Sequence, residues 1–209
     1  MQIAVSGASG LIGSALVARL MAEGHTVSKL VRRPTGRAGG VGEAAEIPWD
    51  PMAGLLEASA LDGLDAVVHL AGESVGGGRW TDARKASIRD SRVLGTRTLV
   101  QAMRRAARPP RILVSASAIG YYGDVPGDAT VTESSAPGDD FLAEVCVAWE
   151  AEANAAREAG VRVVTPRIGV VLDAKGGALQ KLLGPFRAGV GGKVGDGRQW
   201  MSWITSRDV

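Results

Sequence analysis

The chain has 209 residues, enough to bury a complete hydrophobic core, and its 45% hydrophobic and 22% charged residues are typical of a globular protein. Its formal net charge is only +2 and its aromatic content is 4%, which argues against a nucleic-acid partner. The single cysteine, Cys146, excludes an internal disulfide, and no apolar run approaches the ~20 residues of a membrane span. We therefore expect a cytoplasmic protein with neither a membrane nor a nucleic-acid partner.

The first predicted element is a short apolar strand that runs directly into a glycine-rich turn. Residues 3–5 are apolar, Gly7, Gly10 and Gly13 follow at three-residue spacing, and a helical apolar pattern begins at Leu11. In a Rossmann-type domain this order of strand, turn and helix receives the pyrophosphate of a dinucleotide on unpaired helix N–H groups. An ordinary tight turn is the alternative, and a P-loop is excluded because no Gly-Lys-Ser/Thr follows the glycines.

The second predicted strand carries the signal for the type of dinucleotide. An NAD site places Asp or Glu about 20 residues past the glycines, where it binds the adenine ribose hydroxyls. Residues 26–33 contain no acid, and they end on Arg32 and Arg33. Because a guanidinium binds a phosphate dianion well, this pair favours NADP, with Ser9 of the glycine turn as an additional donor. The alternative is a pair of solvated arginines at the end of a strand.

The remaining predicted elements alternate between strands and helices, which indicates an α/β fold with a doubly wound parallel sheet. A glycine-rich loop is expected over residues 36–42. Further strands are predicted over residues 45–49, 65–72, 111–117 and 161–168. Further helices are predicted over residues 55–61, 81–107, 139–159 and 176–188. Ligands of such sheets bind at the C-terminal ends of the strands, where Gly72, Ser117 and Gly169 are expected.

Six segments together give the chain a specific resemblance that covers essentially its whole length. They are residues 7–13, 31–34, 69–73, 79–81, 91–92 and 200–204. With these motifs the chain resembles the epimerase-family proteins of the atypical extended short-chain dehydrogenase/reductase class, described as NADP-dependent nucleoside-diphosphate-sugar epimerases. The resemblance implies an NAD(P)-binding Rossmann domain over residues 1–209, in which residues 170–209 begin the substrate-binding portion.

The resemblance also implies which residues hold the NADP(H) cofactor. The segment from Leu70 to Gly72 would pass beside the adenine ribose and phosphates. Arg92 would reach the cofactor from the long helix, and Gly169 and Val170 would lie near the nicotinamide. The expected cofactor-binding set is Gly7, Ser9, Gly10, Leu11, Ile12, Gly13, Arg32, Arg33, Leu70, Ala71, Gly72, Arg92, Gly169 and Val170. No metal is expected, because the two histidines are not part of a metal-ligand pattern.

The catalytic residues are where the chain departs from this class. Short-chain dehydrogenases use a serine to orient the substrate and a tyrosine as acid/base. A lysine four residues beyond the tyrosine supplies the charge that favours the phenolate. Ser117 matches the serine, but Tyr121 and Tyr122 are followed at that spacing by Val125 and Pro126. Because no lysine occurs between residues 86 and 174, the usual tyrosinate mechanism cannot be assembled.

Two functions remain open from the sequence. In the first, the chain is an NADP-dependent oxidoreductase or epimerase acting on a small carbonyl or sugar-nucleotide-type substrate. Its catalytic residues are then Ser117, Tyr121 and Tyr122, with the charge supplied by an arginine such as Arg92 or Arg167. In the second, the chain binds NADPH without turnover and acts as a redox-sensing module. The missing Tyr-x-x-x-Lys pair favours the second, and the retained serine favours the first.

The last residues carry one further expectation. Proteins of the class that this chain resembles continue with a final strand and a C-terminal lobe that shapes the substrate pocket. Because the sequence has 209 residues, we expect the substrate lobe to be truncated. An uncovered sheet edge would favour association, which leaves a homodimer open.

Overall fold

A computed structural model describes residues 1–35, 43–76, 78–125, 127–193 and 195–209. The chain forms two compact units, Met1–Arg167 and Ile168–Val209. The glycine-rich segment predicted as a loop, residues 36–42, lies outside the described residues.

A seven-stranded sheet forms the centre of the first unit, with the order β4-β3-β2-β1-β5-β6-β8. Every neighbouring pair is parallel except β3 and β4, which are antiparallel. The predicted doubly wound parallel sheet is confirmed, with the addition of an antiparallel edge strand that the sequence did not predict. The strands are β1 (Gln2–Ser6), β2 (Thr26–Val31), β3 (Ala45–Asp50), β4 (Leu55–Leu56), β5 (Ala66–His69), β6 (Ile112–Ser115) and β8 (Arg162–Val164).

The order in which successive strands are added to the sheet reverses between β1 and β5. Strands β1, β2 and β3 are added outward on one side, and β5, β6 and β8 on the other. In β1, Ala4 pairs with Ser28 of β2 and with Val67 of β5. In a sheet of this order the carboxyl ends of the two strands at the reversal open a crevice, and the ligand binds there.

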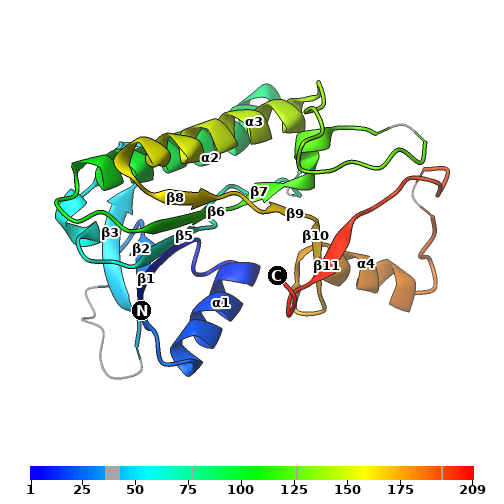
Figure 1. Cartoon of the computed structure of the whole chain (residues 1–209). Helices are drawn as coiled ribbons and strands as arrows, with labels where there is room; N and C mark the ends of the chain where they lie inside the picture. Colours follow the sequence, from blue (N-terminus) through cyan, green and yellow to red (C-terminus); the bar gives the residue numbers. More distant parts are fainter. Residues whose placement is uncertain (36–42, 77, 126, 194) are drawn as a thin grey trace. The chain divides into compact units, whose positions relative to one another are not determined.

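Helices cover both faces of this sheet (Figure 1). Helix α1 (Leu11–Ala22) packs on one face, where the core contains Ile3, Val5 and Val17. Helices α2 (Asp82–Arg105) and α3 (Phe141–Asn154) pack side by side on the other face, over a larger apolar core. Both helices begin at side-chain caps, since Thr81 accepts a hydrogen bond from the Arg84 N–H and Asp140 one from the Ala143 N–H.

Several predicted elements differ in detail from the structure. The prediction of a helix over residues 55–61 was wrong in its first part, because β4 pairs with the end of β3 there; a 3₁₀ turn, Ala58–Leu61, follows. The predicted helix over residues 139–159 is α3 followed by a 3₁₀ segment, Ala155–Ala159. The predicted strands over residues 111–117 and 161–168 are each interrupted. Strands β6 and β8 form their first parts, and separate short strands, β7 (Ser117–Ala118) and β9 (Arg167–Ile168), lie at their ends.

The second unit is small. Strand β10 (Val170–Asp173) pairs in parallel with β11 (Trp203–Thr205), and α4 (Gly177–Arg187) confirms the helix predicted over residues 176–188. Large apolar side chains of this unit are exposed, including Phe186 at 57% and Trp203 at 59%.

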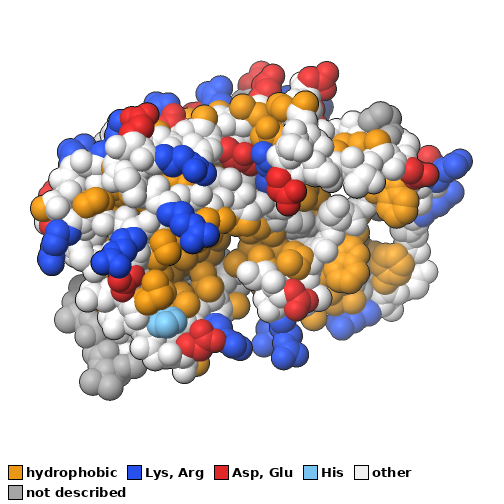
Figure 2. Space-filling view, in the orientation of Figure 1, with side chains coloured by type: hydrophobic (Ala, Val, Ile, Leu, Met, Phe, Trp, Pro, Cys, Tyr) orange, Lys and Arg blue, Asp and Glu red, His pale blue; other side chains and the backbone are white. Residues whose placement is uncertain are grey.

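Charged side chains of both signs are interspersed over the face shown in Figure 2. Among the described residues, none of the helices has the length and apolar character needed to cross a membrane.

Candidate functional site

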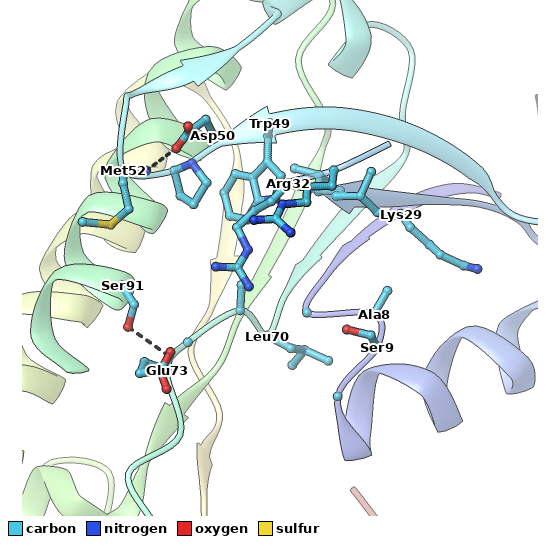
Figure 3. A pocket seen from close by; sticks show the side chains of 18 of the residues that line it. Ala8, Ser9, Lys29, Arg32, Trp49, Asp50, Met52, Leu70, Glu73 and Ser91 are labelled. Carbon is cyan, nitrogen blue, oxygen red and sulfur yellow. Dashed lines mark hydrogen bonds between the residues drawn. The ribbon is translucent and has the colours of Figure 1, made fainter. Parts of the chain in front are cut away.

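A cavity of about 1110 Å³ opens in the first unit where β1, β2, β3 and β5 end (Figure 3). Its walls come from the glycine turn, the end of β2, the end of β3 and the turn after β5, so it coincides with the crevice at the chain reversal. The lining residues are Gly7, Ala8, Ser9, Gly10, Lys29, Leu30, Val31, Arg32, Arg33, Glu46, Trp49, Asp50, Pro51, Met52, Leu70, Ala71, Gly72, Glu73 and Ser91.

The glycine turn requires its glycines for different reasons. Gly7 has φ +68°, and a Cβ there would lie 2.8 Å from the backbone of Leu70. A Cβ on Gly13 would lie 2.2 Å from the carbonyl oxygen of Gly7, so the helix could not begin so close to the strand. Gly10 is the N-cap of α1 and makes no side-chain cap. The first N–H groups of α1, at Leu11, Ile12 and Gly13, therefore lack intrahelical partners and suit an anion.

Basic side chains reach the cavity from the end of β2. Arg32 and Arg33 are exposed and line the cavity, and their guanidinium groups make no hydrogen bond or ion pair with another described residue. Lys29, which the sequence prediction missed, lines the cavity from the same strand. Three cations near one wall create a positive potential for a phosphate group.

Two carboxylates from β3 also line the cavity, and the sequence prediction did not include them. Glu46 accepts hydrogen bonds from the backbone N–H and the hydroxyl of Thr35, at 2.6 and 3.1 Å. Asp50 accepts backbone hydrogen bonds from Met52 and Ala53, both at 3.0 Å. These bonds offset part of the negative charge that the two acids would otherwise present to an anion.

The turn after β5 is tied to helix α2. The Glu73 N–H donates to Ser91 Oγ at 2.9 Å (Figure 3), and Arg92 Nη1 donates to the Glu73 carbonyl at 3.0 Å. Arg92 is not among the lining residues: it packs behind Gly72, 5.2 Å from the ring of Trp149, and burial lowers its pKa. Its guanidinium thus supports the turn from behind.

Ser117 lies in a second polar cluster, between the end of β6 and helix α3. It is 3% exposed, and its hydroxyl donates to Glu150 Oε1 at 2.6 Å. Glu150 also accepts two hydrogen bonds from Arg167, each at 2.9 Å. Burial alone would raise the pKa of Glu150, but the bonds from Arg167 and Ser117 lower it overall. Its hydrogen bonds to Glu150 raise the pKa of Arg167, so this pair stays charged.

Arg167 also connects this cluster to the two tyrosines. Its Nη1 donates to the Tyr122 hydroxyl at 2.9 Å, and its Cζ lies 3.3 Å from the centroid of the Tyr121 ring. The Tyr122 oxygen accepts this bond, so its own proton remains available for another acceptor. The three predicted catalytic residues are therefore connected through Arg167 and through Glu150, a glutamate that the sequence prediction missed.

Cys146 lies one helical turn before Glu150 on α3 and is buried at 4% exposure. Burial is the main reason that the pKa of its thiol is raised, so the thiolate is disfavoured. Gly169 and Val170 belong to the second unit; a Cβ on Gly169 would lie 2.8 Å from the Ser202 carbonyl oxygen of that unit. No set of three potential metal ligands occurs among the residues with described positions.

Comparison with known proteins reveals a family match over almost the whole chain. The profile of the NAD dependent epimerase/dehydratase family matches residues 3–209. An epimerase family protein of Mycobacterium tuberculosis is 43% identical over 206 residues, which is 99% of this chain and 65% of that protein. The chain thus spans just under two thirds of the length of this relative.

Two solved structures are similar to the chain over 99% of its length. The nucleoside-diphosphate sugar epimerase from Corynebacterium glutamicum is 40% identical with a TM-score of 0.80, and 41% of that chain is covered. The human epimerase family protein SDR39U1, solved with NADPH, is 36% identical with a TM-score of 0.82, and 66% of that chain is covered.

Proposed function

The chain belongs to the NAD dependent epimerase/dehydratase family, and on this premise we propose that it binds NADP(H) and acts as an oxidoreductase or epimerase. Its substrate would be a small carbonyl compound or a sugar nucleotide. The observation that carries the proposal is the cavity that joins the glycine turn to Arg32 and Arg33. The solved human relative with NADPH and the Corynebacterium epimerase support the same class of cofactor and substrate.

The residues around the cavity fit a dinucleotide phosphate. The backbone N–H groups of the glycine turn and of the uncapped start of α1 would hold the pyrophosphate, with Ser9 as an additional donor. Arg32 and Arg33 would hold the 2′-phosphate, since no acid of β2 competes for that position.

The adenosine would lie along the turn from Leu70 to Gly72, with Arg92 supporting that turn. Gly169 and Val170 would lie near the nicotinamide.

For catalysis, Arg167 would take the role that a lysine has in short-chain dehydrogenases. NADPH supplies a hydride when bound. Tyr122 would donate its proton to the substrate oxygen, and the guanidinium at 2.9 Å would stabilise the resulting phenolate. Glu150 holds Arg167 in place from the other side.

One observation favours the second candidate, a redox-sensing module without turnover. The Ser117 hydroxyl is buried and already donates to Glu150, so it has no proton to offer a substrate carbonyl. A homodimer and a cytoplasmic location stay predictions.

Calorimetric titration of the chain with NADPH and with NADH tests the cofactor. We expect tighter binding of NADPH; saturable binding of neither nucleotide would contradict the proposal. NADPH consumption in the presence of carbonyl and sugar-nucleotide panels then separates the two candidates. For any substrate found, Tyr122→Phe should lower kcat by about 100-fold or more and leave the NADPH Kd unchanged. An unchanged kcat would exclude Tyr122 as the acid.

A further inference from the structure

His69 is the fully buried histidine at the end of β5. Its exposure is 0%, and its ring meets the ring of Trp49 edge-on at 5.9 Å between centroids. Both ring nitrogens have partners: Nδ1 lies 2.6 Å from Ser6 Oγ, and Nε2 lies 3.0 Å from Thr96 Oγ1. Ser6 ends β1 immediately before the glycine turn, and Thr96 lies on α2.

The partners fix the position of every proton in this group. Thr96 Oγ1 donates to the Arg92 carbonyl at 2.7 Å, so it can only accept from His69, whose Nε2 must carry the hydrogen. A neutral imidazole has one hydrogen, so Nδ1 is bare and accepts from the Ser6 hydroxyl. Burial lowers the pKa of His69 to about 4, which keeps the ring neutral at physiological pH.

Ser6 links His69 to the backbone that lines the cavity. Having given its proton to His69, Ser6 Oγ keeps two lone pairs as acceptors. The backbone N–H groups of Leu70 and Ala71 donate to it, at 3.1 and 3.3 Å, and the Leu70 N–H is shared with the Ser6 carbonyl at 3.3 Å. Both residues line the cavity, and Gly7 lies so close to the backbone of Leu70 that a Cβ there would approach it to 2.8 Å.

We propose that Ser6, His69 and Thr96 are positioning residues of the nucleotide site, acting as one chain of hydrogen bonds with a fixed proton order. The chain runs from Leu70 and Ala71 through Ser6, His69 and Thr96 to the Arg92 carbonyl. It holds the glycine turn and the turn after β5 at a fixed distance from each other, and it anchors both turns to α2. The inference rests on the proposed function.

The Arg92 side chain supports the far end of the same turn. Its Nη1 donates to the Glu73 carbonyl, while its own backbone carbonyl accepts from Thr96. The turn after β5 is thus tied at both ends to one position of α2. Loss of the Thr96 hydroxyl would leave a buried imidazole N–H unpaired and release this end of the turn, without removing any atom that lines the cavity.

The proton order can be measured directly, because the chain has only two histidines. We expect nitrogen NMR of the ring-labelled chain to show one histidine locked as the Nε2–H tautomer with a slowly exchanging proton. His25→Gln should leave that signal in place and so assign it to His69. A hydrogen on Nδ1 of His69, or a mixture of tautomers, would overturn the proposed order.

The positioning role is tested by Thr96→Val, with Thr96→Ser as the variant that keeps the hydroxyl. We expect Thr96→Val to weaken NADPH binding about tenfold and to speed hydrogen exchange at the Leu70 and Ala71 amides. Thr96→Ser should leave the NADPH Kd and the exchange of both amides close to their wild-type values. Val100→Ala, a buried change on the same helix, controls for lost stability and should keep the wild-type Kd.

Ser6→Ala is the second variant, should Thr96→Val not fold, and the same two measurements apply to it. Unchanged Kd and unchanged amide exchange in the variants would overturn the inference while leaving NADP(H) binding intact. If the wild-type chain binds no NADPH, the proposed function fails, whereas the tautomer and the amide exchange still decide whether the hydrogen-bond chain exists.

Discussion

In the proposed function, two arginines at the cavity distinguish NADP(H) from NAD(H). Arg32 and Arg33 extend from the end of β2, and their guanidinium groups are not paired with another described residue. Two charge-assisted hydrogen bonds to a phosphate contribute about 3 kcal/mol together, which corresponds to roughly 100-fold in affinity.

Replacing both arginines therefore separates the two nucleotides. We expect Arg32→Ala with Arg33→Ala to raise the NADPH Kd about 100-fold and to change the NADH Kd by less than about threefold. Calorimetry with each nucleotide measures this. Arg19→Ala, which removes an exposed arginine paired with Glu23, is the control and should alter neither Kd. An equal loss for both nucleotides would show that the pair does not contact the 2′-phosphate.

The cavity-lining residues that the sequence could identify are those set by a local pattern. The glycine turn and the arginine pair can be predicted because each needs only its neighbours in the chain. Glu150 could not be found in this way, because its partners Ser117 and Arg167 are 33 and 17 positions away. The one available signal was its spacing: Cys146 and Glu150 are four residues apart and therefore lie on one face of a helix.

At the scale of elements, the contact between the glycine turn and α1 allows no side chain. We expect Gly13→Ala to abolish NADPH binding and to lower the denaturation midpoint, because its Cβ would lie 2.2 Å from the Gly7 carbonyl oxygen. Gly184→Ala is the matched control in α4, where a Cβ meets nothing within 4 Å. The gain in helix propensity from alanine is offset by the crowding that Pro185 imposes on the residue before it, so stability should change by less than about 1 kcal/mol. Equal behaviour of the two variants would contradict the close-packed turn.

The ion pair between Glu150 and Arg167 fastens α3 to the segment after β8. Their side chains are only 11% and 16% exposed. We expect Glu150→Ala to lower the free energy of unfolding by about 3 kcal/mol at neutral pH, since it leaves a largely buried guanidinium unpaired. Glu152→Ala, on the same helix but in a more exposed pair with Arg97, should cost less than about 1 kcal/mol. Urea denaturation of both variants measures the difference, and equal losses would contradict it.

The sequence predicted elements best where their pattern was long. The helix over residues 81–107 has capping residues at its start and basic residues in its last turn, and α2 matches it closely. The error over residues 55–61 arose because a short apolar run fits both a helix and a strand. Pairing of Leu55 and Leu56 with the end of β3 decides between them, and that contact is not encoded locally.

For the whole molecule, the buried neutral His69 makes stability depend on pH. Its pKa is about 4 in the folded state against 6.5 for the free group, so between these values the unfolded chain binds more protons. Stability is therefore complete above the unfolded pKa and falls as the pH drops toward the folded one. We expect a loss of about 2 kcal/mol between about pH 7.5 and about pH 5.

Urea denaturation of the wild type and of His69→Gln across this range measures the effect. The variant cannot titrate at this position, so its stability should change by less than about 0.5 kcal/mol from this source. Parallel pH profiles for the two proteins would show that His69 is not the group responsible.

The large sheet also limits how copies of the chain could join. Its two outermost strands are very short: β4 contributes two residues and β8 contributes three. Edge strands this short offer few unpaired N–H and C=O groups to a neighbouring molecule, so the sheet is a poor template for continuous extension or fibre growth. Self-association of the first unit would then depend on side chains of its helices, and surface substitutions there would control it.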